Sequence, residues 1–215
     1  MDQTRRALLV GVAGGGIVGT AGCLGDDDPD TGTYDCELEE PDAPEGTFRP
    51  TIGDPDADVV VQAFEDFTCG GCATYKLQQF PSIKEEYIDP GTIRYEHWDF
   101  PIPVDEDWAV PVASAARGVG DREGHEAFFE FASTVYESHP NYDLETIGDA
   151  AEAAGADPCS AIVDAQFETY AATVDEDKDA GITRGVGGTP TVFVNDEEVD
   201  TPTADDIADA IDDAL

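Results

Sequence analysis

The sequence predicts an α/β domain, over residues 57–215, in which a βαβ unit and a ββα unit are separated by an inserted block of helices. Two observations predict this class. Strand-like apolar runs near 59–64, 92–98 and 191–194 are bounded by turn signals. Helical periodicity fills the long interval between the second and third runs, over about 104–180. With 215 residues, 40% of them hydrophobic, the chain can bury one such core.

The first unit consists of a strand, a helix and a second strand. A Gly-Asp-Pro-Asp turn at 53–56 precedes the strand-like run Val59–Phe64. The helical pattern that follows extends to about Tyr87. Pro81 lies inside this pattern and is expected to kink or interrupt the helix, because proline lacks the backbone N–H. Thr92–Trp98 then predicts the second strand.

The second unit closes the chain after the helical block. Thr191–Val194 predicts a strand, Asn195-Asp196 a turn, and Glu198-Val199 a return strand. Thr201-Pro202 is typical of a helix start, with proline at the first helical position. One face of that closing helix carries Ile207, Ile211 and Leu215.

The charge of the chain indicates the environment in which it works. Asp and Glu number 49 against 10 Lys and Arg, and the formal net charge is −39. The acids are spread along the whole length, whereas a single acidic tail would indicate a basic partner. Self-repulsion of this kind is screened at about 1 M salt, where the Debye length is about 3 Å. The composition therefore indicates a halophile more than an ordinary acidic protein, and it excludes nucleic-acid binding, which needs basic residues.

Residues 1–22 form a predicted targeting segment. Thr4–Leu9 resembles a twin-arginine export signal, and the apolar stretch Ala7–Gly19 is too short for a membrane-spanning helix. Thr20-Ala21-Gly22 followed by Cys23 resembles a lipobox, in which the cysteine is lipidated and becomes the mature N-terminus. A plain signal peptide that happens to contain a cysteine is the alternative.

Residues 23–56 are predicted to be an acidic tether leading into the domain, with little structure of their own. A lipid on Cys23 would hold the protein at the outer face of the cell membrane. Disulfides persist in that compartment, which agrees with a functional role for cysteine pairs.

Cys69 and Cys72 form the candidate redox pair. Cys69 falls at the predicted start of a helix, where backbone N–H groups favour the thiolate that attacks a disulfide. Cys72 is one helical turn further on and can close or resolve a disulfide. Half a zinc site is an alternative, but it needs a second close pair that this chain lacks. An inert disulfide is another, although so small a loop contributes little stability.

Two segments together resemble a known family. Phe64–Cys72, followed much later by Gly188–Asn195, resembles the DsbA-like branch of the thioredoxin superfamily, here in a twin-arginine-exported lipoprotein of a halophilic archaeon. The resemblance implies a thioredoxin-like fold, and a cis peptide bond before Pro190. It also implies that Thr189 and Pro190 lie against the redox cysteines, position the substrate chain and help to keep metals away.

The resemblance also implies a mechanism and partners. Cys69 would be the nucleophile that forms a mixed disulfide, and Cys72 would resolve it. Substrates would be cysteine-containing exported proteins, and a membrane redox partner would reset the enzyme. No metal and no organic cofactor is required.

Two departures from the family pattern leave alternatives open. The dipeptide between the cysteines is Gly70-Gly71, whereas strongly oxidising members often carry Pro-His. A reductase or isomerase with the same pair therefore stays possible, as does a non-catalytic, lipid-anchored binding protein. The acid that many relatives place six residues before the first cysteine is replaced by Ala63. Glu65 and Asp66 lie nearby, but strand alternation predicts that they point to opposite faces.

Cys36 and Cys159 remain after the other three cysteines are assigned. An even remainder in an exported protein suggests a structural disulfide between them. Two free thiols, or a resolving role for one of them, are the alternatives. His97 follows the second predicted strand and is interpreted as a structural residue outside the site.

Overall fold

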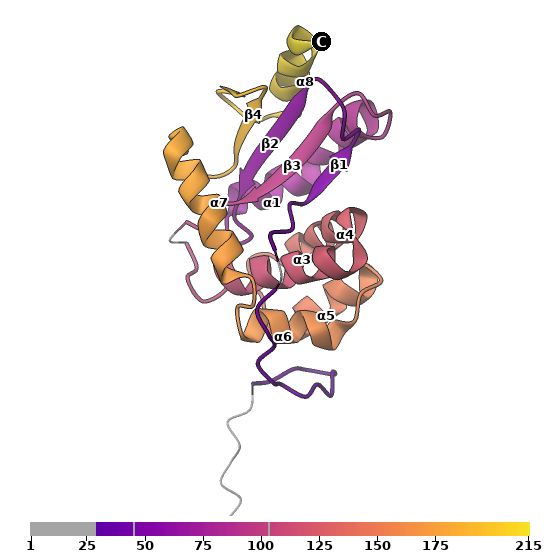
Figure 1. Ribbon diagram of the computed structural model, residues 1–215, viewed down its shortest axis with the longest axis vertical. Coiled ribbons are helices and arrows are strands. Elements are labelled where there is room, and N and C mark those ends of the chain that lie inside the picture. Colours follow the sequence, from indigo (N-terminus) through magenta and orange to yellow (C-terminus); the bar gives the residue numbers. More distant parts are fainter. Residues whose placement is uncertain (1–28, 45, 103) are drawn as a thin grey trace, which may run out of the picture.

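The computed structural model describes residues 29–44, 46–102 and 104–215 (Figure 1). The predicted targeting segment 1–22 and the lipidation candidate Cys23 lie outside the described residues. Within these ranges, no helix is both long and apolar enough to cross a bilayer.

A mixed β-sheet with the strand order β1-β3-β2-β4-β5 forms the centre of the domain. Strands β2 and β3 are parallel, with Ala63 opposite His97, while β1 is antiparallel to β3 and β4 is antiparallel to β2. A parallel pair needs a crossover connection, and the helical run after β2 supplies it. The strands are β1 (Thr51–Gly53), β2 (Val60–Glu65), β3 (Arg94–Asp99), β4 (Thr191–Val194) and β5 (Glu197–Glu198).

The crossover is one helical run with changing hydrogen-bond patterns. It consists of α1 (Gly70–Thr74), the π-helical η1 (Tyr75–Gln79), α2 (Phe80–Ile83) and the π-helical η2 (Lys84–Ile88). Pro81 lies in the first turn of α2, where its missing N–H is tolerated best. The interruption predicted at this proline thus takes the form of a π-helical turn before it.

The inserted block consists of α3 to α7, with α8 following the last strands. In Figure 1, α3 to α6 gather at one end of the sheet and α7 runs alongside it. Asp143 and Asp157 cap α5 and α6 by accepting hydrogen bonds from backbone N–H groups. The helices are α3 (Ala109–Glu123), α4 (His125–Glu137), α5 (Leu144–Ala153), α6 (Pro158–Gln166), α7 (Ala171–Arg184) and α8 (Ala204–Ala214).

Alternation along the strands divides the buried side chains between the two faces of the sheet. Val61 and Ala63 belong to the main core together with residues of the helical run Gly70–Ile88 (the redox helix), the helical block and α8. Phe64 belongs to a second, smaller cluster with Phe100 and Phe193. This second cluster packs under α7, where a Cβ on Gly181 would come within 2.6 Å of the Phe100 ring.

The segment before the first predicted strand is more structured than the sequence indicated. The prediction of a tether with little structure over 23–56 is wrong for its later part, because β1 lies in it and pairs with β3. Tyr34 packs so closely on α5 that a Cβ on Gly148 would lie 2.4 Å from its ring, and its hydroxyl donates to Asp149 at 2.7 Å. The predicted domain start at residue 57 is therefore too late.

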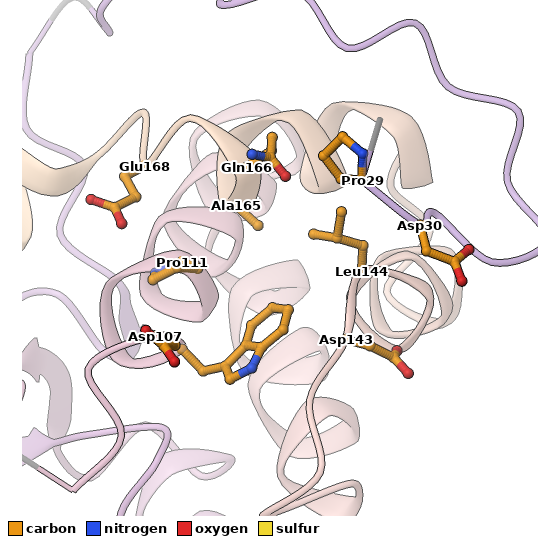
Figure 2. Close-up of a pocket in the computed structure, with 10 residues that line it drawn as sticks. Pro29, Asp30, Asp107, Pro111, Asp143, Leu144, Ala165, Gln166 and Glu168 are labelled. Carbon is orange, nitrogen blue, oxygen red and sulfur yellow. The ribbon is translucent and has the colours of Figure 1, made fainter. Parts of the chain in front are cut away.

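A cavity of about 400 Å³ lies between this N-terminal segment and the helical block (Figure 2). Pro29 and Asp30 line one side of it. The other side includes Trp108, the N-cap residue of α3, together with Leu144 of α5 and Gln166 of α6. None of its lining residues belongs to the redox motif or to the loop around residue 190.

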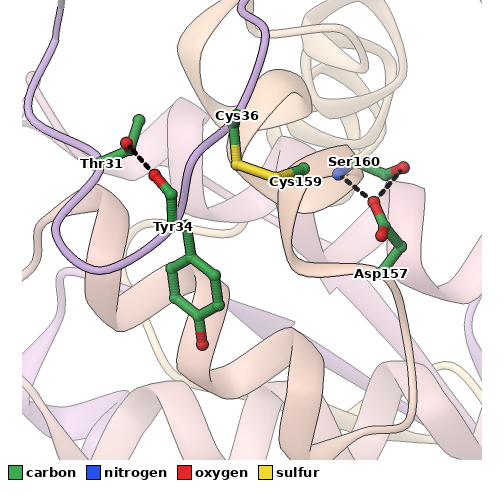
Figure 3. The surroundings of a disulfide bond; sticks show 6 residues. All are labelled: Thr31, Tyr34, Cys36, Asp157, Cys159 and Ser160. Atoms are coloured by element: carbon green, nitrogen blue, oxygen red, sulfur yellow. Dashed lines mark hydrogen bonds between the residues drawn. A yellow bond between two sulfur atoms is a disulfide. The ribbon is translucent and has the colours of Figure 1, made fainter.

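Cys36 and Cys159 form a disulfide, with an S–S distance of 2.01 Å (Figure 3). The bond attaches the N-terminal segment to the start of α6, across 123 residues of sequence. Closing so long a loop restricts the unfolded chain, which is how such a bond stabilises a fold.

Buried charged residues form an alternating chain through the core. Lys76 Nζ lies 3.0 Å from Glu65 Oε1, and His97 lies between two carboxylates. The two imidazole nitrogens are 3.2 Å from Glu65 and 2.9 Å from Asp99. Beyond Asp99, the chain continues through Arg117 to Asp177 on α7, and both side chains are buried. Burial is tolerated because each charge has an opposite neighbour.

Arg117 is the member of this chain whose removal we expect to be most damaging. Arg117→Met keeps the side-chain bulk but removes the guanidinium shared by Asp99 and Asp177, which leaves His97 beside Asp99 and Arg49 beside Asp177. We expect a loss of about 3–5 kcal/mol in the free energy of unfolding, measured by urea titration in molar salt. Lys84→Met breaks an exposed pair with Asp89 and serves as the control, with an expected loss below about 1 kcal/mol. Equal losses for the two variants would contradict the interpretation.

Candidate active site

Cys69 is the N-cap residue of α1, and a short turn separates it from the end of β2. The turn is built by Asp66, whose Oδ1 accepts hydrogen bonds from the N–H and the hydroxyl of Thr68 at 2.7 and 2.8 Å. Asp66 Oδ2 accepts a further hydrogen bond from the Ile102 N–H at 2.8 Å. Cys69 remains 8% exposed at the rim, whereas Cys72 is fully buried.

The surroundings of the two thiols shift their pKa values in opposite directions. A hydrogen bond from Cys72 is the largest cause that lowers the pKa of Cys69, to about 5. Burial opposes the shift, while the Thr189 side chain and the N–H groups of Cys72 and Gly71 add to it. The pKa of Cys72 is raised well above its ordinary value by burial, by its hydrogen bond to Cys69 and by the charge of Glu65. Cys69 is therefore the thiolate of the pair.

The loop before β4 lies directly against Cys69. The Thr189–Pro190 peptide bond is cis, and the Cys69 thiol donates to the Thr189 carbonyl oxygen over 3.3 Å. Thr191 Oγ1 donates to the Gly188 carbonyl at 2.8 Å and holds the loop closed. The structure thus brings together Cys69, Cys72, Thr189 and Pro190, which are far apart in the sequence.

The two glycines of the motif differ in what surrounds them. A Cβ on Gly71 would lie 3.1 Å from the Pro190 ring and 3.5 Å from the Cys69 sulfur, so a side chain there would push against the cis-proline loop. A Cβ on Gly70 would meet only the His139 ring, at an ordinary distance of 3.6 Å. The close approach of the cis-proline loop therefore favours glycine at position 71, whereas position 70 has room for a side chain.

Both acids near the motif are buried. Strand β2 ends at Glu65, so Asp66 belongs to the turn that follows. Both carboxylate oxygens of Asp66 already accept hydrogen bonds, from Thr68 and from the Ile102 N–H. The Glu65 carboxylate shares the core face with Ala63, and its Oε2 has no hydrogen-bond partner among the described residues. Burial raises the pKa of Glu65, but Lys76 and then His97 outweigh burial and keep it below its ordinary value.

His97 is structural, as interpreted from the sequence, but it also links the site to the rest of the core. Burial lowers its pKa, and Asp99 and then Glu65 more than reverse this, so the net shift is upward. A signal was present in the sequence. Tyr95, His97 and Asp99 alternate along β3 and so share one face with Glu65.

No three His, Cys, Asp or Glu side chains within residues 29–44, 46–102 and 104–215 are grouped so as to hold a metal ion. Cys69 and Cys72 are both free thiols, and Cys36 and Cys159 are used in their own disulfide.

The model of the family described as "Thioredoxin" matches residues 47–213. The chain belongs to the thioredoxin family. Within this family, it is 26% identical to disulfide bond formation protein D of Bacillus subtilis over 157 residues, covering 70% of this chain and 69% of that protein.

Solved structures of the same fold agree with this assignment. The oxidised BdbD of Bacillus subtilis superimposes with a TM-score of 0.69 at 25% identity, over 77% of this chain and 92% of that one. DsbA of Chlamydia trachomatis also gives 0.69, at 22% identity, over 79% and 93% of the two chains, which supports the fold. The predicted thioredoxin-like fold with an inserted helical block is confirmed, and the protein is a DsbA-like thiol–disulfide oxidoreductase.

The acidity of Cys69 predicts its reactivity with alkylating agents. We expect the rate of iodoacetamide modification to rise with pH through a midpoint of about 5, because the thiol below the midpoint is protonated and unreactive. Cys72→Ala, which removes the largest stabilising hydrogen bond, should move this midpoint upward, while Cys72→Ser retains a donor and should move it less. A wild-type midpoint near that of an ordinary thiol, about 8.5, would contradict this assignment.

Proposed function

We propose that the protein donates disulfides to exported proteins through Cys69 and Cys72. The observation that carries this proposal is the stabilised Cys69 thiolate at the rim of the site, next to a buried Cys72. A thiol with a low pKa is a good leaving group, and its reduced state is favoured, which makes the corresponding disulfide oxidising.

The steps follow from the arrangement of the two sulfurs. A substrate thiolate attacks Cys69 Sγ of the oxidised enzyme, the S–S bond breaks, and Cys72 leaves and takes up a proton, which its raised pKa favours. A second substrate thiolate then attacks the substrate sulfur of the mixed disulfide. Cys69 departs as a thiolate, the substrate is oxidised and the enzyme reduced. A membrane redox partner that accepts two electrons would restore the disulfide, through attack by Cys69 and resolution by Cys72.

Thr189 and Pro190 position the substrate in this proposal. Their loop contacts the Cys69 sulfur, so an extended chain bound along it would present its cysteine to the exposed side of Cys69. Glu65 is proposed as the buried carboxylate in place of the acid missing at Ala63, because its charge is felt at Cys72 and one of its oxygens is unpartnered in the part of the chain that the structure describes.

The low pKa of Cys69 supports disulfide donation as the direction of the reaction. At pH 7 a thiol with a pKa of about 5 is ionised, whereas an ordinary thiol is still protonated. The two pH units between 5 and 7 are therefore the part of the pKa shift that stabilises the reduced state. This favours the reduced state by roughly 2–3 kcal/mol, equivalent to on the order of 50 mV. The reductase or isomerase reading lacks a comparable observation, and a non-catalytic scaffold would not need a stabilised thiolate.

The equilibrium reduction potential of Cys69–Cys72 tests the proposal. Titration against glutathione buffers in molar salt should give a value nearer to about −120 mV, typical of a disulfide donor, than to about −270 mV. A value near the latter would favour the reductase. No exchange at all would leave the binding protein as the remaining alternative.

The location proposed for this activity is the outer face of the cell membrane of a halophilic archaeon. The supporting features are the resemblance of residues 1–22 to a twin-arginine signal, the lipobox-like segment ending at Cys23, and the net charge of −39. The Cys36–Cys159 disulfide agrees with a compartment in which disulfides persist.

Lipidation of Cys23 is testable by its removal. In cells that export the protein, Cys23→Ser should shift it from the membrane fraction to the medium, because the anchoring thiol is lost. Cys36→Ser, which removes a cysteine from the domain, should leave the protein in the membrane fraction. Retention of Cys23→Ser in the membrane would contradict the lipid anchor.

A further inference from the structure

Three consecutive carbonyl groups before the nucleophile are held by side chains of the helical block. Tyr136 donates its hydroxyl to the Asp66 carbonyl at 3.1 Å, and Tyr142 donates to the Phe67 carbonyl at 2.6 Å. The third carbonyl, that of Thr68, lies 3.0 Å from His139 Nε2. The three donors come from the end of α4 and the loop before α5, within seven residues of one another.

The hydrogen bond at Thr68 fixes the tautomer of His139. A carbonyl oxygen can only accept, so Nε2 must carry the hydrogen and donate it. The same ring lies beside the redox motif, since a Cβ on Gly70 would be 3.6 Å from its Cε1 atom. His139 therefore lies beside the first turn of α1 and binds the carbonyl group that is bonded to the Cys69 nitrogen.

His139 differs from the two tyrosines in its setting. Tyr136 and Tyr142 are buried members of the main hydrophobic core, so their packing alone accounts for their presence. His139 is only half-buried and does not belong to that core. Its ring forms a hydrogen bond with the Thr68 carbonyl.

We propose that His139 is a positioning residue for the redox pair, which stabilises the reduced enzyme by binding the Thr68 carbonyl. A carbonyl dipole next to Cys69 opposes the negative charge of its thiolate. An N–H donor on the carbonyl oxygen offsets that dipole and holds it turned toward the helical block. The His139 ring thus supplies a side-chain N–H donor near Cys69. Gly70 and Gly71 have no side chains and cannot supply one. This inference rests on the proposed function of the pair.

The test compares variants with and without the donor. His139→Phe keeps a ring but loses the N–H, whereas His139→Gln retains an N–H donor. The measured quantity is the equilibrium constant for oxidation of the pair by oxidised glutathione, in molar salt at pH 7. One lost hydrogen bond should raise this constant about fivefold for His139→Phe, because the reduced state loses stability. His139→Gln should stay within about twofold of wild type.

Ser133→Ala is the matched control, since it removes a side-chain hydrogen bond to a carbonyl within α4, that of Phe129. It should leave the constant unchanged. If the phenylalanine variant does not fold, His139→Leu removes the donor with a smaller side chain, and the same comparison applies. A constant within twofold of wild type for the donor-less variant, or an equal shift in His139→Gln, would overturn the role of His139. The ratio of variant to wild type is independent of the wild-type potential, so this failure is distinguishable from failure of the proposed disulfide donor.

Discussion

The alternating chain of buried charges is the constraint on which the rest of this structure depends. Glu65 of β2, Lys76 of the redox helix, His97 of β3 and Arg117 of α3 lie in one sequence of contacts, which continues to Asp177 of α7. Removing a member takes away one of the opposite charges that compensate its buried neighbours. The sheet, the redox helix and the helical block must therefore assemble in one relative arrangement, and the Cys69–Cys72 pair lies at the end of the chain next to Glu65.

The same arrangement separates the two thiols chemically. Cys69 receives hydrogen bonds that favour its thiolate, while burial and the Glu65 charge keep Cys72 protonated. The proposed disulfide donation uses this asymmetry, because one sulfur is attacked at the surface and the other leaves toward the interior and takes up a proton. The cis-proline loop completes the site through its approach to Gly71, where a side chain would push against Pro190.

The helical block contributes more to the site than its place in the sequence indicates. Its side chains donate to the carbonyls of Asp66, Phe67 and Thr68, which places the turn before Cys69 under the control of residues some 70 positions away. The disulfide between Cys36 and Cys159 attaches the N-terminal segment to the same block. The helical block is therefore hydrogen-bonded to the turn before Cys69 and linked by a disulfide to the N-terminal segment.

The sequence by itself determined the fold class and the redox motif, because local periodicity and the spacing of Cys69 and Cys72 are visible in a single chain. It also determined that Gly188–Asn195 accompanies the motif. Only the tertiary structure decided what surrounds the sulfurs. The burial of Glu65, the short strand β1 and the contact of His139 with Thr68 depend on residues that meet across long sequence separations, and a local pattern carries no information about such contacts.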